Sequence, residues 1–307
     1  MTPASPSVRI SRKALTGHLR GFLRSLRNRR PETRGTYERA LREFFRWFGN
    51  DGEFRFRVAD VERYKRHLAR RKKLSAVSVS TYLTALRRFC EYLVHARVLG
   101  MNPARLVEGN KRPQSHSRVP LGADDIEKLF GVVDRQDERG RRDYAFILLM
   151  LDCALSEIEI VRADVADLTD GADGSTMLVQ GKGRTRKDAA VRIPPSVRLA
   201  LGEYLAIRPS TPATEPLFTS AGNRTRGRRM TTRGVRDRVN MYLERAGIKQ
   251  GRIREVTPYS LRHTAALRMA ALGATPEEIR DRMRLGSVAT AMLYVAQSRQ
   301  EAQPPEQ

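Results

Sequence analysis

Four short segments in the second half of this 307-residue chain carry cationic or hydroxyl side chains in a fixed order. They are LSEI at 155–158, GKG at 181–183, YSLRHT at 259–264 and a tyrosine at 294. Guanidinium and ammonium groups bind phosphate oxygens, and a guanidinium can do so with two parallel hydrogen bonds. The segments therefore contain side chains suited to a phosphate, provided that the elements carrying them meet in the fold.

The charge of the chain points to a polyanionic partner. There are 58 Lys and Arg residues against 34 Asp and Glu, a formal net charge of +24. Residues 1–112 hold 27 of the basic and 9 of the acidic residues, so this part alone carries +18. Nucleic acid is the usual polyanion for such a chain, and an acidic membrane surface is the second candidate. The excess of Arg over Lys suits phosphate and guanine contacts, although a GC-rich genome also produces it.

Composition also argues against several classes of protein. Cys90 and Cys153 lie among apolar residues, so we expect reduced, buried thiols, because a structural zinc site needs four clustered ligands. The start MTPASPSV has no apolar run, which predicts no signal peptide. No segment approaches the ~20 apolar residues that span a bilayer. We expect a soluble, cytoplasmic protein that binds neither a membrane nor a metal.

Residues 9–104 are predicted to form four amphipathic helices, because apolar residues recur there at helical spacing. The polar faces of these helices are mostly positive. One basic face is usually just a solvated surface, but three in one bundle are better explained by phosphate contacts. The apolar residues are Leu15, Leu19, Phe22 and Leu26, then Tyr37, Leu41, Phe44 and Phe48, then Val61, Tyr64 and Leu68, and finally Leu83, Leu86, Phe89, Cys90 and Leu93.

A linker and a second domain are predicted to follow. Residues 105–118 lack apolar periodicity and predict an exposed linker. Residues 119–299 are predicted to form helices around short strands at 176–180 and 189–194, with helices resuming at Pro195. The segment Thr275-Pro276-Glu277-Glu278 predicts a helix start with a capping box. The polar residues 300–307 predict a frayed tail.

The four segments in this order resemble the tyrosine recombinase family, which comprises the phage integrases and their chromosomal relatives. The resemblance runs from about residue 11 to 298 and includes Asn102-Pro103, which typically closes the last helix of the family's core-binding domain. It implies a mainly α protein with a small β-sheet. A four-helix SAM-like core-binding domain would precede an α+β catalytic domain.

The resemblance implies strand exchange without a metal or other cofactor. In the family a tyrosine hydroxyl attacks a DNA phosphodiester, which leaves a 3′-phosphotyrosyl bond and a free 5′-hydroxyl, and rejoining reverses the step. Carried over by position, Tyr294 fits the nucleophile, Arg262 the second arginine and Lys182 the lysine that protonates the leaving oxygen. Arginines stabilise the charge that builds up on the phosphate, and the nucleophile must be held in line with the leaving oxygen.

Three positions depart from the family pattern. Ala154 stands where the first arginine normally lies, and Leu285 stands where a His or Trp precedes the nucleophile by nine residues. Tyr259 replaces a histidine and can still donate a hydrogen bond, so it joins the candidate catalytic residues. Losing one preorganised donor costs about 10²–10³ in rate. We therefore expect cleavage by an isolated subunit to be slow or undetectable.

Three other arginines are candidates to replace the first arginine, which is missing at position 154. Arg162, Arg282 or Arg284 could supply the absent guanidinium, and the sequence leaves this choice open. His263 is not a substitute, because one step along a helix turns a side chain by about 100°, away from the face of Arg262. We expect His263 to be a core residue.

DNA contacts are predicted on the basic faces, mostly to phosphates. The fourth N-terminal helix is the first choice for contact in a groove, followed by the turn after residue 183 and the helix start near residue 233. The candidates are Ser80, Thr81, Thr84, Arg87 and Arg88, then Arg184, Arg186 and Lys187, then Arg233 and Arg236.

Three hypotheses about function remain. The first is a working site-specific recombinase or integrase with an atypical site, acting on double-stranded DNA as a dimer or tetramer, with a partner recombinase as one way to complete its chemistry. The second is a non-enzymatic accessory or regulatory DNA-binding protein on the same fold. The third, an unrelated basic nucleic-acid-binding repressor, is disfavoured by the ordered motifs. None involves a small-molecule substrate.

Overall fold

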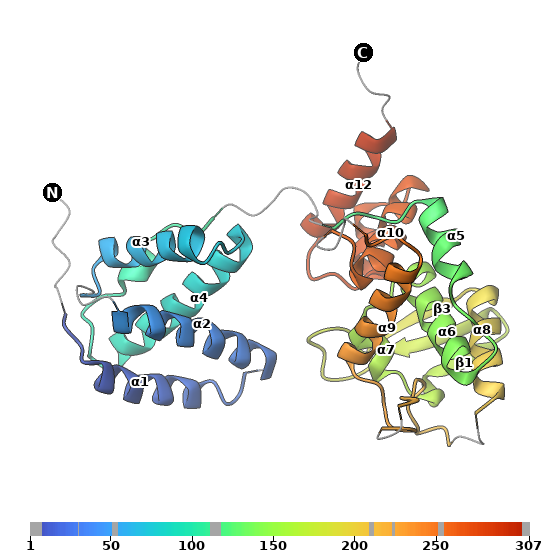
Figure 1. Cartoon of the computed structure of the whole chain (residues 1–307), viewed down its shortest axis with the longest axis horizontal. Coiled ribbons are helices and arrows are strands. Elements are labelled where there is room, and N and C mark those ends of the chain that lie inside the picture. Colours follow the sequence, from blue (N-terminus) through green and yellow to red (C-terminus); the bar gives the residue numbers. More distant parts are fainter. Residues whose placement is uncertain are drawn as a thin grey trace, which may run out of the picture. The chain divides into compact units, whose positions relative to one another are not determined.

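The computed structural model describes residues 8–29, 31–50, 55–110, 118–208, 212–222, 225–250 and 255–302. The chain divides into two compact units, Met1–Pro113 and Gln114–Gln307 (Figure 1). The division falls within the segment for which the sequence predicts a linker.

The first unit is the expected four-helix domain. Each helix buries the apolar stripe seen in the sequence, including Leu15, Phe44, Tyr64 and Phe89. Ser11 and Ser75 are the N-caps of the first and last helices, and the side chain of each accepts a backbone N–H of the first turn. The elements are α1 (Arg12–Ser25), α2 (Pro31–Asn50), α3 (Val58–Arg66) with a π-helical continuation (His67–Arg71), α4 (Ala76–His95) and a 3₁₀ turn (Pro103–Arg105).

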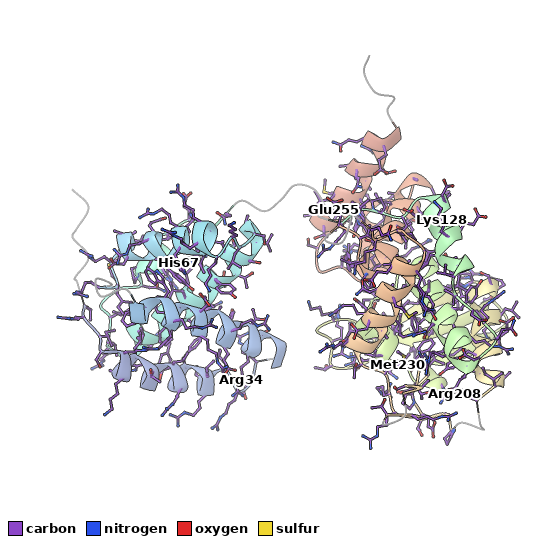
Figure 2. The ribbon with its side chains drawn as sticks, viewed as in Figure 1. Arg34, His67, Lys128, Arg208, Met230 and Glu255 are labelled. Atoms are coloured by element: carbon purple, nitrogen blue, oxygen red, sulfur yellow. The ribbon has the colours of Figure 1, made fainter. Side chains whose placement is uncertain are left out.

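Aromatic side chains fill the core of this unit. Phe44 meets Tyr64 edge to face with ring centroids 5.2 Å apart, and Phe22 meets Phe89 in the same way at 5.6 Å. His67 stacks on the Tyr64 ring at the rim of this cluster and is labelled in Figure 2. Phe45 of α2 lies 5.9 Å from Phe89 of α4 between ring centroids and links the two pairs, so the four helices share one core.

The segment after α4 packs on its own unit. The Asn102 side chain donates to the Arg87 carbonyl oxygen (2.9 Å) and accepts from the backbone N–H of Ala104 (3.1 Å). Val107 is buried, and Asn110 donates to the Ala76 carbonyl oxygen (3.0 Å). Residues 105–110 of the predicted linker therefore pack on the first unit through a few contacts, while Arg105, Leu106, Glu108 and Gly109 are exposed. Residues 111–117 of that linker lie outside the described part of the chain.

The second unit contains the remaining helices and a three-stranded antiparallel sheet in the order β1-β2-β3. The capping box at Thr275 is present as expected. The strand β1 was not expected, since it is short and mostly exposed. The elements are α5 (Ala123–Gly131), α6 (Glu138–Asp152), α7 (Glu157–Arg162), a 3₁₀ turn (Val165–Asp167), β1 (Leu168–Gly171), β2 (Gly174–Val179), β3 (Ala189–Ile193), α8 (Pro195–Ala206), α9 (Thr232–Arg245), α10 (Pro258–Ala271), α11 (Pro276–Arg282) and α12 (Val288–Ala302).

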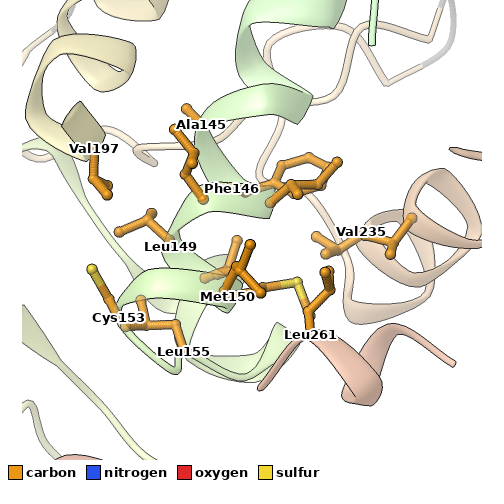
Figure 3. Close-up of a cluster of buried hydrophobic side chains, with 14 of the residues drawn as sticks. Ala145, Phe146, Leu149, Met150, Cys153, Leu155, Val197, Val235 and Leu261 are labelled. Carbon is orange, nitrogen blue, oxygen red and sulfur yellow. The ribbon is translucent and has the colours of Figure 1, made fainter. Parts of the chain in front are cut away.

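Helix α6 forms the centre of this unit. Figure 3 shows Leu149 and Met150 of α6 among Val197 of α8, Val235 of α9 and Leu261 of α10. A helix that is apolar nearly all round is stable only when other elements enclose it. The α6–α7 corner and the start of α10 are thereby held against a rigid core, and these two places carry two of the four sequence segments.

Two stretches differ from the sequence expectation in detail. The described residues between α8 and α9 form turns and two antiparallel bridges, Asp164–Pro216 and Thr219–Arg229, instead of the expected helix. Residues 300–302 continue α12, so the predicted frayed tail is helical there, and residues 303–307 lie outside the described part. Across the described residues, no helix combines the length and the apolar character that a membrane crossing requires.

Candidate active site and DNA-contact surface

Arg262 is the best-anchored of the predicted catalytic side chains. It lies on the second turn of α10, which starts at Pro258 after the N-cap Thr257. Its Nη1 donates to the Ala154 carbonyl oxygen (2.6 Å) and to Glu159 Oε2 (2.7 Å), and its Nη2 donates to the Met283 carbonyl oxygen. Arg262 is 6% exposed. Its hydrogen bonds connect α10 to the α6–α7 corner and to the end of α11.

Glu159 on α7 is the anion of this site, although the sequence did not identify it. Its Oε2 accepts hydrogen bonds from the backbone N–H and the hydroxyl of Ser156, both at 2.7 Å. Glu159 is 2% exposed, and burial by itself would raise the pKa of its carboxyl group. The hydrogen bond from Arg284 and the charges of Arg262 and Arg284 outweigh that effect and lower the pKa to about 2. The carboxylate is therefore ionised at neutral pH.

Arg284 is the second guanidinium bound to Glu159. Its Nε donates to Glu159 Oε1 (2.5 Å), and its Nη2 donates to Glu159 Oε2 (3.1 Å) and to the Ala154 carbonyl oxygen (2.9 Å). The backbone is left-handed at both Ala154 (φ 51°) and Arg284 (φ 52°). Side chains with a Cβ rarely adopt this conformation, so the two residues that approach each other here are both strained.

Tyr294 lies on α12 and is fully buried (0% exposed). It packs in a small apolar cluster with Ala154 and Met283, and its ring centroid is 5.1 Å from that of His263. Burial, followed by the effects of the neighbouring Tyr259, raises the pKa of Tyr294 above its usual range, while the charge of Arg262 lowers it. The hydroxyl is therefore near Tyr259 and Arg262, but a phosphate reaches it only if α12 or its covering residues move.

The other predicted catalytic positions surround this cluster. Tyr259, on the first turn of α10, is 36% exposed. Lys182 is exposed in the turn between β2 and β3. That turn passes close to the site, since a Cβ added to Gly181 would lie 3.6 Å from Glu159 Oε1, and Arg162 Nη1 donates to the Gly181 carbonyl oxygen (3.0 Å). The fold thus brings the GKG segment to the Arg262–Glu159 pair.

Ala154 and Leu285, the two positions without a polar side chain, both lie in or against the apolar cluster of Tyr294. Ala154 is buried, and its carbonyl oxygen, rather than its methyl group, meets the two guanidiniums. Leu285 packs against the apolar cluster of Tyr294. A cavity of about 970 Å³ borders this region, and Ala154 and Arg284 line it together with Arg282.

The signal for the residues that were missed is weak but present. Glu159 is a charged residue within EIEIVR, whose other inward positions Ile160 and Val161 are buried. A carboxylate on the buried face of a helix requires a cation. Nothing in the local sequence identifies Arg284 as that cation, because 125 positions separate the two residues.

The predicted contact residues of α4 fall on two different stripes of the helix. Ser80 and Arg87 face the segment after α4. Ser80 Oγ accepts from the backbone N–H of Asn110 (3.2 Å), and Arg87 donates to the carbonyl oxygens of Ala104 (2.9 Å) and Val107 (2.6 Å). The other stripe is open to solvent to a greater degree and consists of Val77, Thr81, Thr84 and Arg88. The second stripe is therefore the more accessible of the two to a duplex.

The predicted contact residues of the second unit also divide into two groups. Lys187 is held by Asp164 (2.5 Å) and Asp167, and these hydrogen bonds outweigh burial and raise its pKa. The exposed cations are Arg184 and Arg186 in the β2–β3 turn and Arg233 and Arg236 near the start of α9. Three of them make ion pairs: Arg184 with Asp188 (3.4 Å), Arg233 with Asp237 (3.5 Å) and Arg236 with Glu157 (3.5 Å).

Exposed arginines also cover α2 of the first unit. Arg34, which Figure 2 labels, is followed by three more at helical spacing. Two of these have acidic neighbours, Arg42 with Glu38 (2.6 Å) and Arg46 with Glu43 (3.0 Å). The set is Arg34, Arg39, Arg42 and Arg46.

The cysteines are buried, as expected for core thiols. Cys90 and Cys153 are both free, and burial raises the pKa of the Cys153 thiol to about 12. Among the described residues there is no group of three or more His, Cys, Asp or Glu side chains placed to hold a metal ion.

Comparison with known families accounts for both units. Residues 120–301 match the family described as the phage integrase family. Residues 19–97 match the phage integrase N-terminal SAM-like domain. Together the two matches cover most of the chain.

Individual relatives and solved structures agree with these matches. A tyrosine recombinase of Synechococcus elongatus is 28% identical over 82% of this chain and 80% of the relative. The tyrosine recombinase XerC of Serratia marcescens is 28% identical over 96% and 92%. The fold is similar to that of the XerH site-specific recombinase bound to palindromic difH substrate (TM-score 0.71, 17% identity, 96% of this chain and 83% of that one). It is also similar to a lambda integrase dimer bound to a core site (TM-score 0.68, 13% identity, 90% and 96%).

Proposed function

Because the chain belongs to the phage integrase family of tyrosine recombinases, we propose that it cuts and rejoins double-stranded DNA at specific sites through a covalent bond to Tyr294. The observation that carries the proposal is the convergence of Arg262 and Tyr294 from α10 and α12: Tyr294 packs with Ala154 and Met283, and Arg262 donates to the carbonyl oxygens of the same two residues.

The proposed reaction uses side chains and solvent water. The Tyr294 oxygen attacks phosphorus while its proton passes to water, the bond from phosphorus to the 5′ oxygen breaks, and the electron pair of that bond remains on the 5′ oxygen. Lys182 gives this oxygen a proton, which produces a free 5′-hydroxyl and a 3′-phosphotyrosyl bond. Arg262 binds a non-bridging oxygen as its negative charge increases, and Tyr259 donates a hydrogen bond. Rejoining is the same sequence in reverse, so the bond energy is conserved.

The proposal requires the site to open before cleavage. Tyr294 is enclosed, and the raised pKa of its hydroxyl makes it a poor nucleophile in this conformation. DNA that binds more tightly to the open form would shift the population towards it. Cleavage is therefore coupled to correct placement on a duplex.

A second candidate function follows from the same enclosure. Glu159 already neutralises part of the charge of both arginines, and Ala154 and Leu285 offer no polar side chain to a phosphate. A protein of this kind could serve as a non-enzymatic DNA-binding accessory or regulator of recombination.

A covalent-adduct assay separates the two functions. A target duplex is first selected from a randomised pool by its binding to the purified protein, and it is then prepared with a nick near the cleavage position so that rejoining fails. We expect the protein to form a denaturation-resistant adduct and Tyr294→Phe to form none while binding the same duplex equally well. Absence of an adduct from the unaltered protein, with intact duplex binding, would favour the accessory function.

The assembly on DNA is part of the proposal. The lambda integrase of similar fold is a dimer on its core site, and exchange between two duplexes needs a subunit at each cleaved strand. We propose that this chain acts in the cytoplasm as a dimer or tetramer on paired sites, alone or with a partner recombinase.

A further inference from the structure

Two guanidinium groups in the second unit share the same pair of acceptors. Arg262 and Arg284 both donate to the Glu159 carboxylate and to the Ala154 carbonyl oxygen. They come from different elements, α10 and the turn that follows α11. Two guanidiniums around one anion is also the arrangement that best holds a phosphate, because each can offer parallel N–H donors.

We propose that Arg284 supplies the guanidinium that the residue at position 154 lacks, so that Arg262 and Arg284 together hold the phosphate that is cut. This inference rests on the proposed cleavage by Tyr294. Arg284 reaches back across the site until its Nη2 is 2.9 Å from the Ala154 carbonyl oxygen. The guanidinium therefore lies beside the backbone of the position where the resemblance expects an arginine.

The other two arginines that the sequence left open have different roles. Arg162 donates to the Gly181 carbonyl oxygen and so supports the turn that carries Lys182. Arg282 contributes its carbonyl oxygen, which accepts a hydrogen bond from Arg284 Nη1. Of the three, Arg284 is the one whose guanidinium meets the acceptors of Arg262.

Glu159 positions the two guanidiniums. Like charges repel at this distance, and the repulsion is strong where water is excluded. The buried carboxylate of Glu159 between them reduces this repulsion and orients both guanidinium groups before DNA binds. The side chain of Arg284 is 10% exposed and that of Arg262 is 7% exposed, so the arrangement is fixed by packing as well as by charge.

The backbone at this place supports a functional role for Arg284. A left-handed backbone normally favours glycine, yet positions 154 and 284 carry alanine and arginine. Among the described residues of the second unit, these two are the residues other than glycine with this conformation, whereas Phe56, Lys73 and Arg97 adopt it in the first unit. An arginine in such a position, with its side chain directed into the site, fits the need for a fixed cation near phosphorus.

The test moves the guanidinium from one position to the other. Rates of adduct formation on the selected nicked duplex are compared for the unaltered protein, Arg284→Gly, and the double variant Arg284→Gly with Ala154→Arg. Glycine removes the guanidinium and relieves the backbone strain. We expect the first variant to lose at least about 100-fold in adduct rate with little loss of duplex binding, and the double variant to recover much of that loss. Recovery cannot arise from misfolding, so it distinguishes chemistry from stability.

Arg280→Ala is the matched control. It removes one partly exposed positive charge from α11, where Arg280 pairs with Asp281, and should leave the adduct rate unchanged. An Arg284→Gly variant as fast as the unaltered protein would overturn the role of Arg284 while leaving cleavage by Tyr294 intact. An adduct that forms only after Ala154→Arg would also overturn it, because position 154 would then be the place that needs an arginine. If neither the unaltered protein nor any variant formed an adduct, both the proposed cleavage by Tyr294 and the proposed role of Arg284 would be wrong.

Discussion

The Glu159 carboxylate between two guanidiniums dominates the electrostatics of the candidate site. All three groups are nearly enclosed, so their interactions are stronger than those of exposed pairs. Removing one member of such a group costs more than removing a surface ion pair, since the remaining charges stay buried without compensation. The same property makes the site sensitive to acid.

Replacing Glu159 by glutamine should destabilise the second unit at neutral pH. The change leaves two buried guanidiniums without their counter-charge, at a cost of about 3–5 kcal/mol in the free energy of unfolding. Urea unfolding at pH 7 measures it. Arg280→Ala is a suitable control, because it breaks a pair between exposed residues on α11, and exposed pairs contribute little.

The acid dependence follows from the direction of the pKa shift. The pKa of Glu159 falls from 4.5 to about 2 on folding, so its contribution is complete above pH 4.5 and is lost as the pH falls towards 2. We expect the unaltered protein to lose about 3 kcal/mol from this group over that range, and Glu159→Gln to lack this part of the slope. If the free energies of unfolding of the two proteins fell in parallel with pH, the assigned interactions of Glu159 with Arg262 and Arg284 would be contradicted.

At the scale of elements, α4 carries two different stripes of polar side chains: one binds the segment that follows the helix, and the other is the predicted surface for DNA. Arg87 and Ser80 hold the segment that returns along the helix, whereas Thr81, Thr84 and Arg88 lie on the other stripe. A helix offers one face to the core and one to solvent. On α4 a third face binds the segment that follows the helix, so a smaller part of the helix surface is left for DNA.

Two neighbouring arginines of α4 should therefore give opposite results. Arg88→Ala should weaken duplex binding and reduce the slope of log affinity against log salt concentration by about 1, the value for one lost phosphate contact. Arg87→Ala should instead lower the stability of the first unit by about 1–3 kcal/mol, because two buried carbonyl oxygens lose their donor. Fluorescence anisotropy and thermal unfolding measure the two effects. If Arg87→Ala weakened binding at unchanged stability, the division into stripes would be wrong.

At the scale of the whole molecule, charge determines how the protein meets its partner. A net charge of +24 on 307 residues favours a polyanion regardless of sequence, and most of this excess lies in the first unit. Affinity from such contacts comes largely from the release of counterions. Specific recognition then requires some of the predicted DNA-contact residues to bind base edges as well as phosphates.

Duplex binding should accordingly depend steeply on salt. With about 6–10 phosphate contacts, affinity should fall by about 10³–10⁵ between roughly 50 and 200 mM salt. Anisotropy titrations with the selected duplex and with a scrambled duplex of equal length measure this. Both should show a steep slope, with the selected duplex bound more tightly. A shallow slope, or a marked preference for RNA of the same sequence, would contradict the proposed mode of binding.

The sequence by itself determined the parts of this protein that depend on neighbours along the chain. Apolar periodicity located α1 to α4, and local capping signals located the start of α11, because helix formation is governed by residues within a few positions of one another. The ordered motifs identified the family and the positions of Arg262 and Tyr294. These predictions needed no knowledge of which segments meet.

Only the tertiary structure decided which side chains share the site. Glu159 and Arg284 are 125 positions apart, and the strained turn that aims Arg284 at Ala154 has no local sequence pattern. The enclosure of Tyr294 likewise arises from the packing of α12 against α10 and the α6–α7 corner. Contacts of this range depend on how the whole chain packs, and a buried charge selects its partner only when packing has excluded water from both.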